Sequence, residues 1–475
     1  MSRMRAVSRP LESAPDLNDV AGEHGYLFVR DGVGFAGRDN AVRATLTDAP
    51  SLLNDIEHVD QTGWGVPGPI ALGLMPFDRH STSTAVVPRI IIGKDSAGRC
   101  WSTTIDDANI PTFDPPPRPS ASSFSVEPLT PIETYLNAVV TARDAVRSGE
   151  LVKAVIARQI TVRSDDPISV HSVLSRLRNS FGSSYRYSID GFIGASPELL
   201  LSIDGDIVRS HPLAGTTPRT GDPQRDDELA NRLLESIKDQ IEHRVVIDVI
   251  HEMLLPYCSY LDWEPEPSVV KVANVQHLGT LIEGRLRDAH PPILDLARNL
   301  CPTPALGGHP RDLALTLISQ HEGFERDAYG GAVGWLDARG NGTWAVAIRC
   351  ARFSDDRRRA VLTAGGGIVA GSEPRRTCRN PSQVPSDVVG DRPTLTVSAT
   401  RRRQRIEACK RRCSSTSTSR SVATTVTVGP RVPSRVFNSV IDPADAASRP
   451  KAAAMATRSV PCGVPNSVSK VSPPS

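Results

Sequence analysis

The sequence predicts an α+β fold. Short runs of β-branched and aromatic residues, at 26–30, 70–78 and 87–93, are broken by glycine and proline, which is typical of strands. The Asp-Gly pairs at 190–191 and 204–205 are typical of hairpin turns. Two later stretches, beginning near residues 132 and 226, carry apolar residues at helical spacing. Strands joined by tight turns and at least two substantial helices are therefore expected in one chain.

The composition is that of an ordinary globular protein. With 475 residues, 39% of them hydrophobic, and a net charge of +2, the chain has enough apolar residues for a large core and no charge excess that selects a partner. No run is long enough to span a membrane, and residues 1–16 lack the apolar core of a secretory signal, so we expect a cytoplasmic protein. Cys409 and Cys413 have a spacing compatible with zinc, but no second pair accompanies them.

The first predicted helix begins after Thr130. Thr130, Pro131 and Glu133 form the pattern of a capping box with proline at the first helical position. Apolar residues follow at helical spacing, and Gly149 marks the end. We therefore expect a helix over 132–149.

The next predicted strand, 151–162, places Lys153 among β-branched neighbours. Lys153 and Arg158 differ in parity, so their side chains are expected on opposite faces. An apolar environment lowers the pKa of a lysine enough for it to act as a base. At a strand edge, by contrast, a lysine simply extends to solvent, and this is the commoner case for a lysine taken alone.

Glu198 is a second charged residue in an apolar stretch. It stands between Pro197 and Leu199 in the strand-like run 192–202. A buried glutamate holds its proton to higher pH than an exposed one and so suits proton donation. The alternative is a glutamate that faces water at the end of a strand.

The longest predicted helix begins near Asp226 and Asp227 and is stopped by Pro256. Glu242 lies next to the apolar side of this helix, where an unpaired carboxylate is costly. The required cation is either Lys238, one turn back, or a bound metal; a solvated Glu242 paired with Lys238 is the simpler alternative. The apolar stripe is expected at every fourth position, through Leu229, Leu233, Ile237, Ile241, Val245 and Val249.

Seven ordered motifs between residues 25 and 373 together resemble those of the chorismate-utilising enzymes, and among them the isochorismate synthases. This resemblance implies a chorismate-binding fold, α+β with mixed, mainly antiparallel sheets flanked by helices, forming a catalytic domain over 25–373. The motifs are Lys-Ala-Val-Ile-Ala-Arg at 153–158, Ala-Ser-Pro-Glu-Leu at 195–199, Pro-Leu-Ala-Gly-Thr at 212–216, Lys-Asp-Gln-Ile-Glu-His at 238–243, His-Leu-Gly-Thr at 277–280, Pro-Thr-Pro-Ala-Leu-Gly-Gly at 302–308, and Ile-Arg-Cys at 348–350 with Ala-Gly-Gly-Gly-Ile-Val at 364–369.

The resemblance also implies a reaction, the conversion of chorismate to isochorismate by an isomerase. Lys153 would be the general base that activates water for attack on the second ring carbon. Glu198 would be the general acid that protonates the hydroxyl leaving the fourth ring carbon, and Glu242 would hold Mg²⁺, a cation that prefers carboxylates. Substrate-binding positions would be Arg349, which suits a carboxylate through its planar fork, together with Gly215, Thr216, His277, Ala305 and Gly365.

Residue types distinguish the branches of this family. Anthranilate synthases resemble this chain but carry glutamine in place of Lys153 and use ammonia, whereas aminodeoxychorismate synthases place a nucleophilic lysine where this chain has Ala214. Salicylate synthases keep the base lysine and are the closest alternative. The resemblance implies a small-molecule substrate, chorismate, for a monomer without nucleic-acid or membrane partners. Its product would enter siderophore or menaquinone synthesis.

The resemblance ends after about residue 373. A minor departure is Cys301, where such enzymes commonly have histidine. The family continues into a helix of the form Glu-x-x-Glu-Thr-x-x-Lys, whose second glutamate binds metal and whose lysine binds a substrate carboxylate, but Glu373-Pro374 is followed here by basic and polar residues. One choice of codons for Arg379-Asn-Pro-Ser-Gln-Val, read one base later, gives Glu-Thr-x-Ala-Lys, so we hypothesise that a frameshift produced the departure.

On this hypothesis residues 374–475 form a largely disordered, frameshifted tail. An inactive chorismate-binding protein that lacks the last catalytic helix is then an alternative to an active isochorismate synthase. Residues 1–24 are also expected to be disordered. A basic nucleic-acid-binding tail, suggested by the runs at 401–405 and 410–412, is the rival interpretation of the C-terminus. No aromatic residues interleave these runs to stack on bases, which disfavours it.

Overall fold

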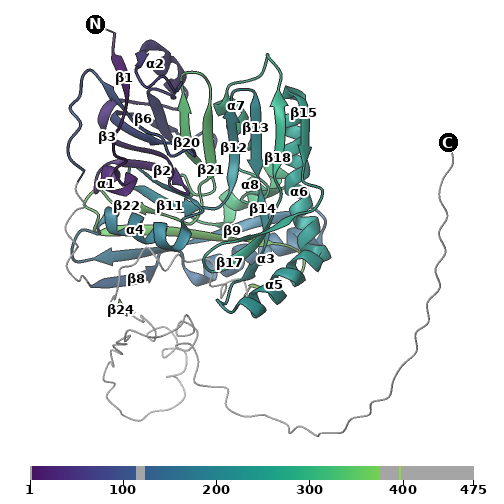
Figure 1. The fold of residues 1–475 in the computed structure, drawn as a ribbon. Helices are drawn as coiled ribbons and strands as arrows, with labels where there is room; N and C mark the ends of the chain where they lie inside the picture. Colours follow the sequence, from purple (N-terminus) through teal and green to yellow (C-terminus); the bar gives the residue numbers. More distant parts are fainter. Residues whose placement is uncertain (1–2, 114–122, 375–394, 397–475) are drawn as a thin grey trace, which may run out of the picture. The chain divides into compact units, whose positions relative to one another are not determined.

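The computed structural model describes residues 3–113, 123–374 and 395–396, all within one compact unit (Figure 1). The expected frameshifted tail, the basic runs and the Cys409/Cys413 pair therefore lie outside the described residues. The exception within the tail is β24 (Leu395–Thr396), which pairs in parallel with β8 (Phe124–Pro128).

The N-terminus differs from the expected disordered segment over 1–24. β1 (Arg5–Pro10) pairs in parallel with β4 (Glu57–Asp60) and antiparallel with β7 (Cys100–Ile105). A short helix, α1 (Leu17–Ala21), follows, and its N-cap Asp16 accepts a hydrogen bond from the Asn18 backbone. That prediction was wrong because the partners of β1 lie 50 to 100 residues away in sequence, where local composition gives no sign of them.

The strands form mixed, mainly antiparallel sheets, as the sequence predicts. In the large sheet each strand pairs antiparallel with the next, in the order β8–β9–β23–β22–β11–β10–β2–β3–β6–β5–β20–β21–β12–β13–β18–β15. A smaller antiparallel sheet has the order β14–β17–β16. Their bounds are β2 Tyr26–Arg30, β3 Val33–Ala44, β5 Ile70–Met75, β6 Thr84–Lys94, β9 Lys153–Ser164, β10 Tyr185–Ile189, β11 Phe192–Ser196, β12 Leu199–Asp204, β13 Ile207–His211, β14 Leu213–Pro218, β15 Cys258–Trp263, β16 Ser268–Lys271, β17 Val275–Gly279, β18 Ile282–Leu286, β19 Gly308–His309, β20 Ala332–Asp337, β21 Gly342–Val346, β22 Cys350–Phe353 and β23 Arg359–Ile368.

The hairpin turns predicted at Asp190-Gly191 and Asp204-Gly205 are confirmed. They join β10 to β11 and β12 to β13, and both glycines have positive φ. The predicted run 192–202, however, is two strands, because the chain leaves β11 after Ser196 and re-enters β12 at Leu199. Glu198 occupies the break.

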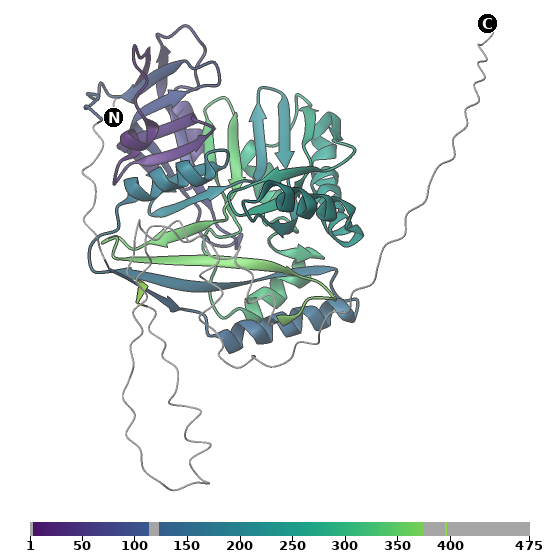
Figure 2. The same ribbon diagram turned by 60° about the horizontal axis from the view of Figure 1, so that its bottom comes forward.

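Helices cover the sheets. Figure 2 shows β9 and β23 as long neighbouring strands with α3 beneath them, and α3 packs on β9. Arg158, on β9, lies with its guanidinium 5.5 Å from the Tyr135 ring of α3. The bounds are α2 Ala49–Asp55, α3 Ile132–Arg147, α4 Val170–Phe181, α5 Pro223–Glu235, α6 Ile237–Leu254, η1 Leu255–Tyr257, α7 Ile293–Leu300 and α8 Arg311–His321.

The helix predicted at 132–149 is present as α3, but the capping box is not. Pro131 is the N-cap residue and makes no side-chain cap. Thr130 Oγ1 instead accepts a hydrogen bond from the Gln159 backbone of β9, at 2.9 Å. Thr130 therefore binds a neighbouring strand and does not cap the helix, and the local sequence pattern cannot show this.

The long helix predicted from Asp226 to Pro256 is two helices. Ser236 ends α5 with an extended ψ of 103° and caps α6, because its side chain accepts from the Asp239 backbone. The every-fourth-residue stripe was wrong as well: Ile237 and Ile241 are 75% and 59% exposed. A four-residue repeat drifts around a helix of 3.6 residues per turn, and the buried side of α6 is formed by His243, Val246, Ile247, Ile250 and Leu254.

Among the described residues no helix is long and apolar enough to cross a membrane.

Candidate active site

The centre of the candidate site is an ion pair between β9 and α6. Lys153 is the first residue of β9 and is only 5% exposed, so it does not extend to solvent. Its Nζ lies 2.6 Å from Oε1 of Glu242. The lysine that contacts Glu242 is not Lys238, as the simpler alternative has it, but one 89 positions away in the sequence. Burial raises the pKa of Glu242, but the charge and hydrogen bond of Lys153 outweigh it, and the pKa lies below its ordinary value.

Gly367 makes room for this pair. β23 runs antiparallel to β9 with Gly367 opposite Val155. A Cβ at Gly367 would lie 2.9 Å from Lys153 Cε and 3.1 Å from Glu242 Oε1. Only glycine leaves both side chains undisturbed at this point of β23. The sequence pointed instead to Gly365, where a Cβ would lie 2.9 Å from the hydroxyl oxygen of Tyr329.

Glu198 is buried, at 3% exposure, in the break between β11 and β12. Burial raises its pKa to about 8, against the lowering effect of a backbone hydrogen bond at Leu213 and of the charges of Lys153 and Arg349. No described residue hydrogen-bonds its Oε1. At neutral pH Glu198 therefore carries a proton, and it does not face water as an exposed strand-end residue would.

A second polar cluster surrounds His277 on β17. Arg349 Nη2 donates to His277 Nε2 at 2.7 Å. His277 Nδ1 lies 3.1 Å from the Gly215 carbonyl oxygen and 3.0 Å from Thr216 Oγ1. Desolvation, followed by the charge of Arg349, lowers the pKa of His277 to about 3, so the ring is neutral. Because Nε2 accepts from Arg349, the proton must be on Nδ1, which donates to Gly215.

His277 thereby orients Arg349, but one hydrogen-bond donor of the guanidinium, Nη1, has no partner among the described residues. It has a positive φ of 52°, directly before β22. Burial lowers its pKa to about 10, while the nearby Glu198 opposes the shift. No described residue accepts a hydrogen bond from its buried Nη1. A buried guanidinium with an unmet donor suits an anionic group of a ligand.

Ala305 lies in the turn that ends at Gly307. The Gly307 carbonyl oxygen accepts a hydrogen bond from Val155 N at 3.0 Å, which places this turn beside β9. The structure brings most of the predicted site residues together. Lys153 contacts Glu242, and the charges of Lys153 and Arg349 act on Glu198. Arg349 contacts His277, which in turn contacts Gly215 and Thr216.

The sequence alone did not assign a role to Gly367 or Tyr329. Gly367 lies within the motif at 364–369, but its role depends on the register of β9 with β23.

The described residues do not by themselves fit a bound metal. No group of three or more His, Cys, Asp or Glu side chains among them could hold one. Glu242 is a single carboxylate, and it is already neutralised by Lys153. Mg²⁺ is usually bound through one or two carboxylates together with substrate groups and water. The resemblance implies a second carboxylate in the segment after residue 374, where this sequence has basic and polar residues instead.

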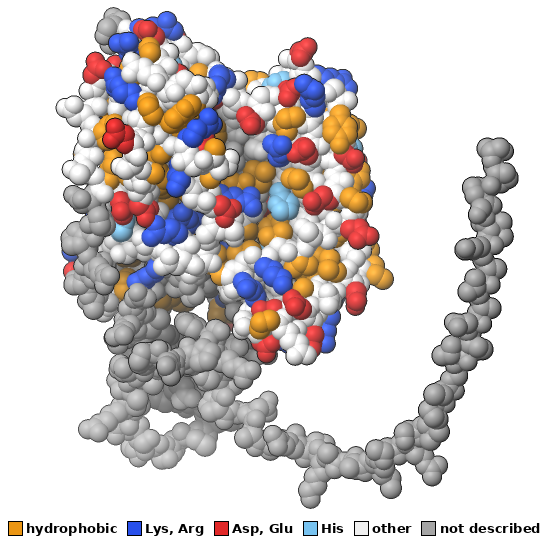
Figure 3. Space-filling view, viewed as in Figure 1, with side chains coloured by type: hydrophobic (Ala, Val, Ile, Leu, Met, Phe, Trp, Pro, Cys, Tyr) orange, Lys and Arg blue, Asp and Glu red, His pale blue; other side chains and the backbone are white. Residues whose placement is uncertain are grey.

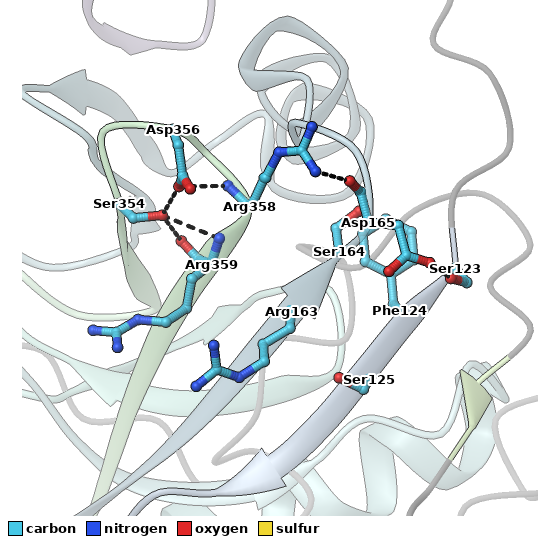
Figure 4. A pocket seen from close by; sticks show the side chains of 10 residues that line it. All are labelled: Ser123, Phe124, Ser125, Arg163, Ser164, Asp165, Ser354, Asp356, Arg358 and Arg359. Atoms are coloured by element: carbon cyan, nitrogen blue, oxygen red, sulfur yellow. Dashed lines mark hydrogen bonds between the residues drawn. The ribbon is translucent and has the colours of Figure 1, made fainter.

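A surface cavity of about 550 Å³ is lined by residues that do not include Lys153 (Figure 4). It is lined by residues including Arg163, which is ten positions along β9 from Lys153, or roughly 33 Å in an extended strand. A smaller cavity of about 290 Å³ lies against α6 and includes His243. Neither contains Lys153 or Glu198. On the face shown in Figure 3, hydrophobic side chains gather near β14 and β17.

Fold, motifs and site place this chain in one class of protein. A sequence profile described as chorismate binding enzyme matches residues 78–379. The chain therefore belongs to the chorismate-binding enzymes, as its motifs indicate.

Its relatives are more specific. The chain is 39% identical over 319 residues to a putative isochorismate synthase MenF of Mycobacterium tuberculosis, covering 64% of this chain and 82% of the relative. It is 35% identical over 323 residues to the isochorismate synthase DhbC of Bacillus subtilis, covering 65% and 77%. The crystal structure of a putative 2,3-dihydroxybenzoate-specific isochorismate synthase, DhbC from Bacillus anthracis, superposes with a TM-score of 0.64 at 30% identity, covering 77% of this chain and 96% of that one.

Proposed function

We propose that this chain is an isochorismate synthase, an isomerase that converts chorismate to isochorismate. The observation that carries the proposal is that a buried carboxyl group, Glu198, and a buried amine, Lys153, lie in one site. Glu198 holds a proton at neutral pH, while Lys153 is a buried amine next to a carboxylate. A reaction that removes one proton and supplies another needs a base and an acid in the same site.

In the proposed reaction Lys153, in its neutral amine form, takes a proton from the water that attacks the second ring carbon. Glu198 gives its proton to the hydroxyl that leaves the fourth ring carbon. A carbon–oxygen bond forms at one position and another breaks, with the ring double bonds shifting between them. One water enters and one leaves, so the reaction is an isomerisation.

Arg349 is proposed to bind a carboxylate of chorismate through its free Nη1. His277 fixes the plane of the guanidinium through Nη2, and is itself fixed by Gly215. Because His277 is neutral, it does not compete with Arg349 for the anion. The two groups thus form a preorganised carboxylate-binding end of the site.

We also propose Mg²⁺ as the cofactor, with Glu242 as a ligand. Bound there, the ion would supply positive charge for a substrate carboxylate. The described residues offer no group of three or more potential ligands, so substrate, water or the segment after residue 374 would have to supply the other ligands.

The proposal includes a cytoplasmic monomer that acts on a small molecule without a nucleic-acid partner. Siderophore and menaquinone synthesis are both retained as routes for the product. Relatives named as isochorismate synthases support the activity itself.

The test is turnover of chorismate by the purified chain with Mg²⁺, with products separated by chromatography. A parallel chain, restored to the alternative frame after Pro374, controls for the altered C-terminus. Formation of isochorismate by either chain would support the proposal if the substitutions K153A and E198Q in that chain abolish it. Salicylate as the product would favour the salicylate synthase alternative. Two folded but inactive chains would refute the isochorismate synthase assignment, whereas activity of the restored chain alone would identify this chain as an inactive chorismate-binding protein.

A further inference from the structure

One edge of β9 is interrupted close to Lys153. β23 pairs with β9 along its other edge, from Ala154 to Arg163. On the interrupted edge β19 pairs only with Lys153 and Ala154, and β8 pairs only from Ile160 onward. The backbone groups between these two strands need partners from elsewhere, because unpaired buried backbone groups are costly.

Two charged side chains take the place of a strand in this gap. Glu322 Oε1 accepts a hydrogen bond from Ala157 N at 2.7 Å. Arg326 Nη2 donates to the Val155 carbonyl oxygen at 2.6 Å, and Arg326 Nη1 donates to the Leu306 carbonyl oxygen at 2.9 Å. The pair therefore joins the backbone of β9 to the turn before β19.

Glu322 and Arg326 also hold each other. Arg326 Nε donates to Glu322 Oε2 at 2.8 Å, and Nη2 pairs with Oε1. Their side chains are 1% and 2% exposed. The guanidinium carbon lies 4.3 Å from the centre of the Phe77 ring, which fixes its plane.

Stability alone does not account for such a pair. A buried ion pair often contributes no more than hydrophobic residues of similar volume. Hydrophobic side chains, however, could not bond the backbone at Val155 and Ala157. The observed contacts point to a role in placing β9 itself.

We propose that Glu322 and Arg326 are positioning residues, which hold β9 and the 303–307 turn so that Lys153 meets its substrate. This inference rests on the proposed function, because it takes Lys153 as the base. Val155 is two residues, or about 7 Å, from Lys153 along the strand. Arg349 and His277 lie on other elements, so the carboxylate-binding end of the site is independent of the pair.

The experiment compares the full chain with E322Q, E322A and R326M. The control is E228Q, which breaks the exposed Arg225–Glu228 pair on α5. Hydrogen exchange of peptides covering 153–160 is measured beside kcat and KM for chorismate, with circular dichroism to confirm folding. E322Q keeps an oxygen acceptor for Ala157 N, whereas E322A does not.

We expect R326M and E322A to exchange the β9 amides at least tenfold faster than the full chain, with E322Q in between and E228Q unchanged. kcat should fall at least tenfold in R326M and E322A while KM stays within twofold. Unchanged exchange in folded R326M and E322A, or equal loss of kcat in E322Q and E322A, would overturn the proposal. If the unmodified chain and its restored form do not turn over chorismate, the proposed function fails, and with it the link to Lys153, while exchange still reports whether the pair holds β9.

Discussion

The most direct prediction concerns the buried carboxyl of Glu198. Its pKa is raised from an ordinary 4.5 to about 8 by burial. A raised carboxyl pKa contributes most to stability below the unfolded value and progressively less as pH rises, because the unfolded chain releases a proton that the folded chain keeps. Between pH 4.5 and 8 the free energy of unfolding should therefore fall with rising pH.

The substitution E198Q removes this titration while keeping the size of the side chain. From the shift, the stability of the unmodified chain relative to E198Q should fall by about 3 kcal/mol between pH 5 and pH 7.5. Glu198 is 3% exposed, so screening by solvent does not reduce this figure much.

The assay is urea unfolding of both chains at pH 5, 6.5 and 7.5, followed by circular dichroism. Only the difference between the chains is used, which cancels the titration of all other groups. Parallel pH dependence of the two chains would show that Glu198 titrates normally, and its role as a proton donor at neutral pH would be refuted. This measurement does not require catalytic activity.

Three further changes test other parts of the site. G367A should lower kcat/KM for chorismate about 100-fold, because the new methyl group displaces the Lys153 ammonium; G371A, where nothing lies within 4 Å, is the matched control, and equal activity of the two would contradict the role of Gly367. K153M should lower the free energy of unfolding by about 2–4 kcal/mol at pH 7 because it leaves Glu242 without its cation; the loss should shrink at low pH as the carboxyl is protonated, and a pH-independent loss in urea unfolding would argue against the pair. Removing Mg²⁺ with a chelator should abolish isochorismate formation in whichever chain is active, and activity that survives chelation would remove the metal from the proposal.

The sequence identified residues of the candidate site but not the contacts between them. Lys153, Glu198, Arg349 and His277 were found from motifs, and the structure brings them together. Lys153 and Glu198 are charged residues in apolar runs, and such a conflict between residue and surroundings is visible in the sequence. Arg349 and His277 came from the family motifs. The predicted family and fold class were confirmed. They could be predicted because the ordered motifs extend over most of the chain.

The parts that the sequence missed depend on tertiary partners. Predicting that Lys153 is the cation that pairs with Glu242 would have required knowing how β9 packs against α6. Predicting the role of Gly367 would have required the register of β9 with β23. The break at Ser236 was hidden because serine is tolerated inside helices and apolar residues continue on both sides of it. Glu322 has no local oddity as a charged residue at the end of a helix; its role appears only once the missing strand beside β9 is seen.

The pairing of β9 with β23 also determines when, during synthesis of the chain, the site can form. These strands are separated by about 200 positions, yet their register places Gly367 over the side chain of Lys153. During synthesis the N-terminal parts of a chain emerge first, and contacts between distant segments form slowly. Lys153 is therefore incompletely enclosed until β23, near the end of the described chain, has been synthesised. Alterations of the gene just downstream of β23 would then affect the chain at the moment when its site closes.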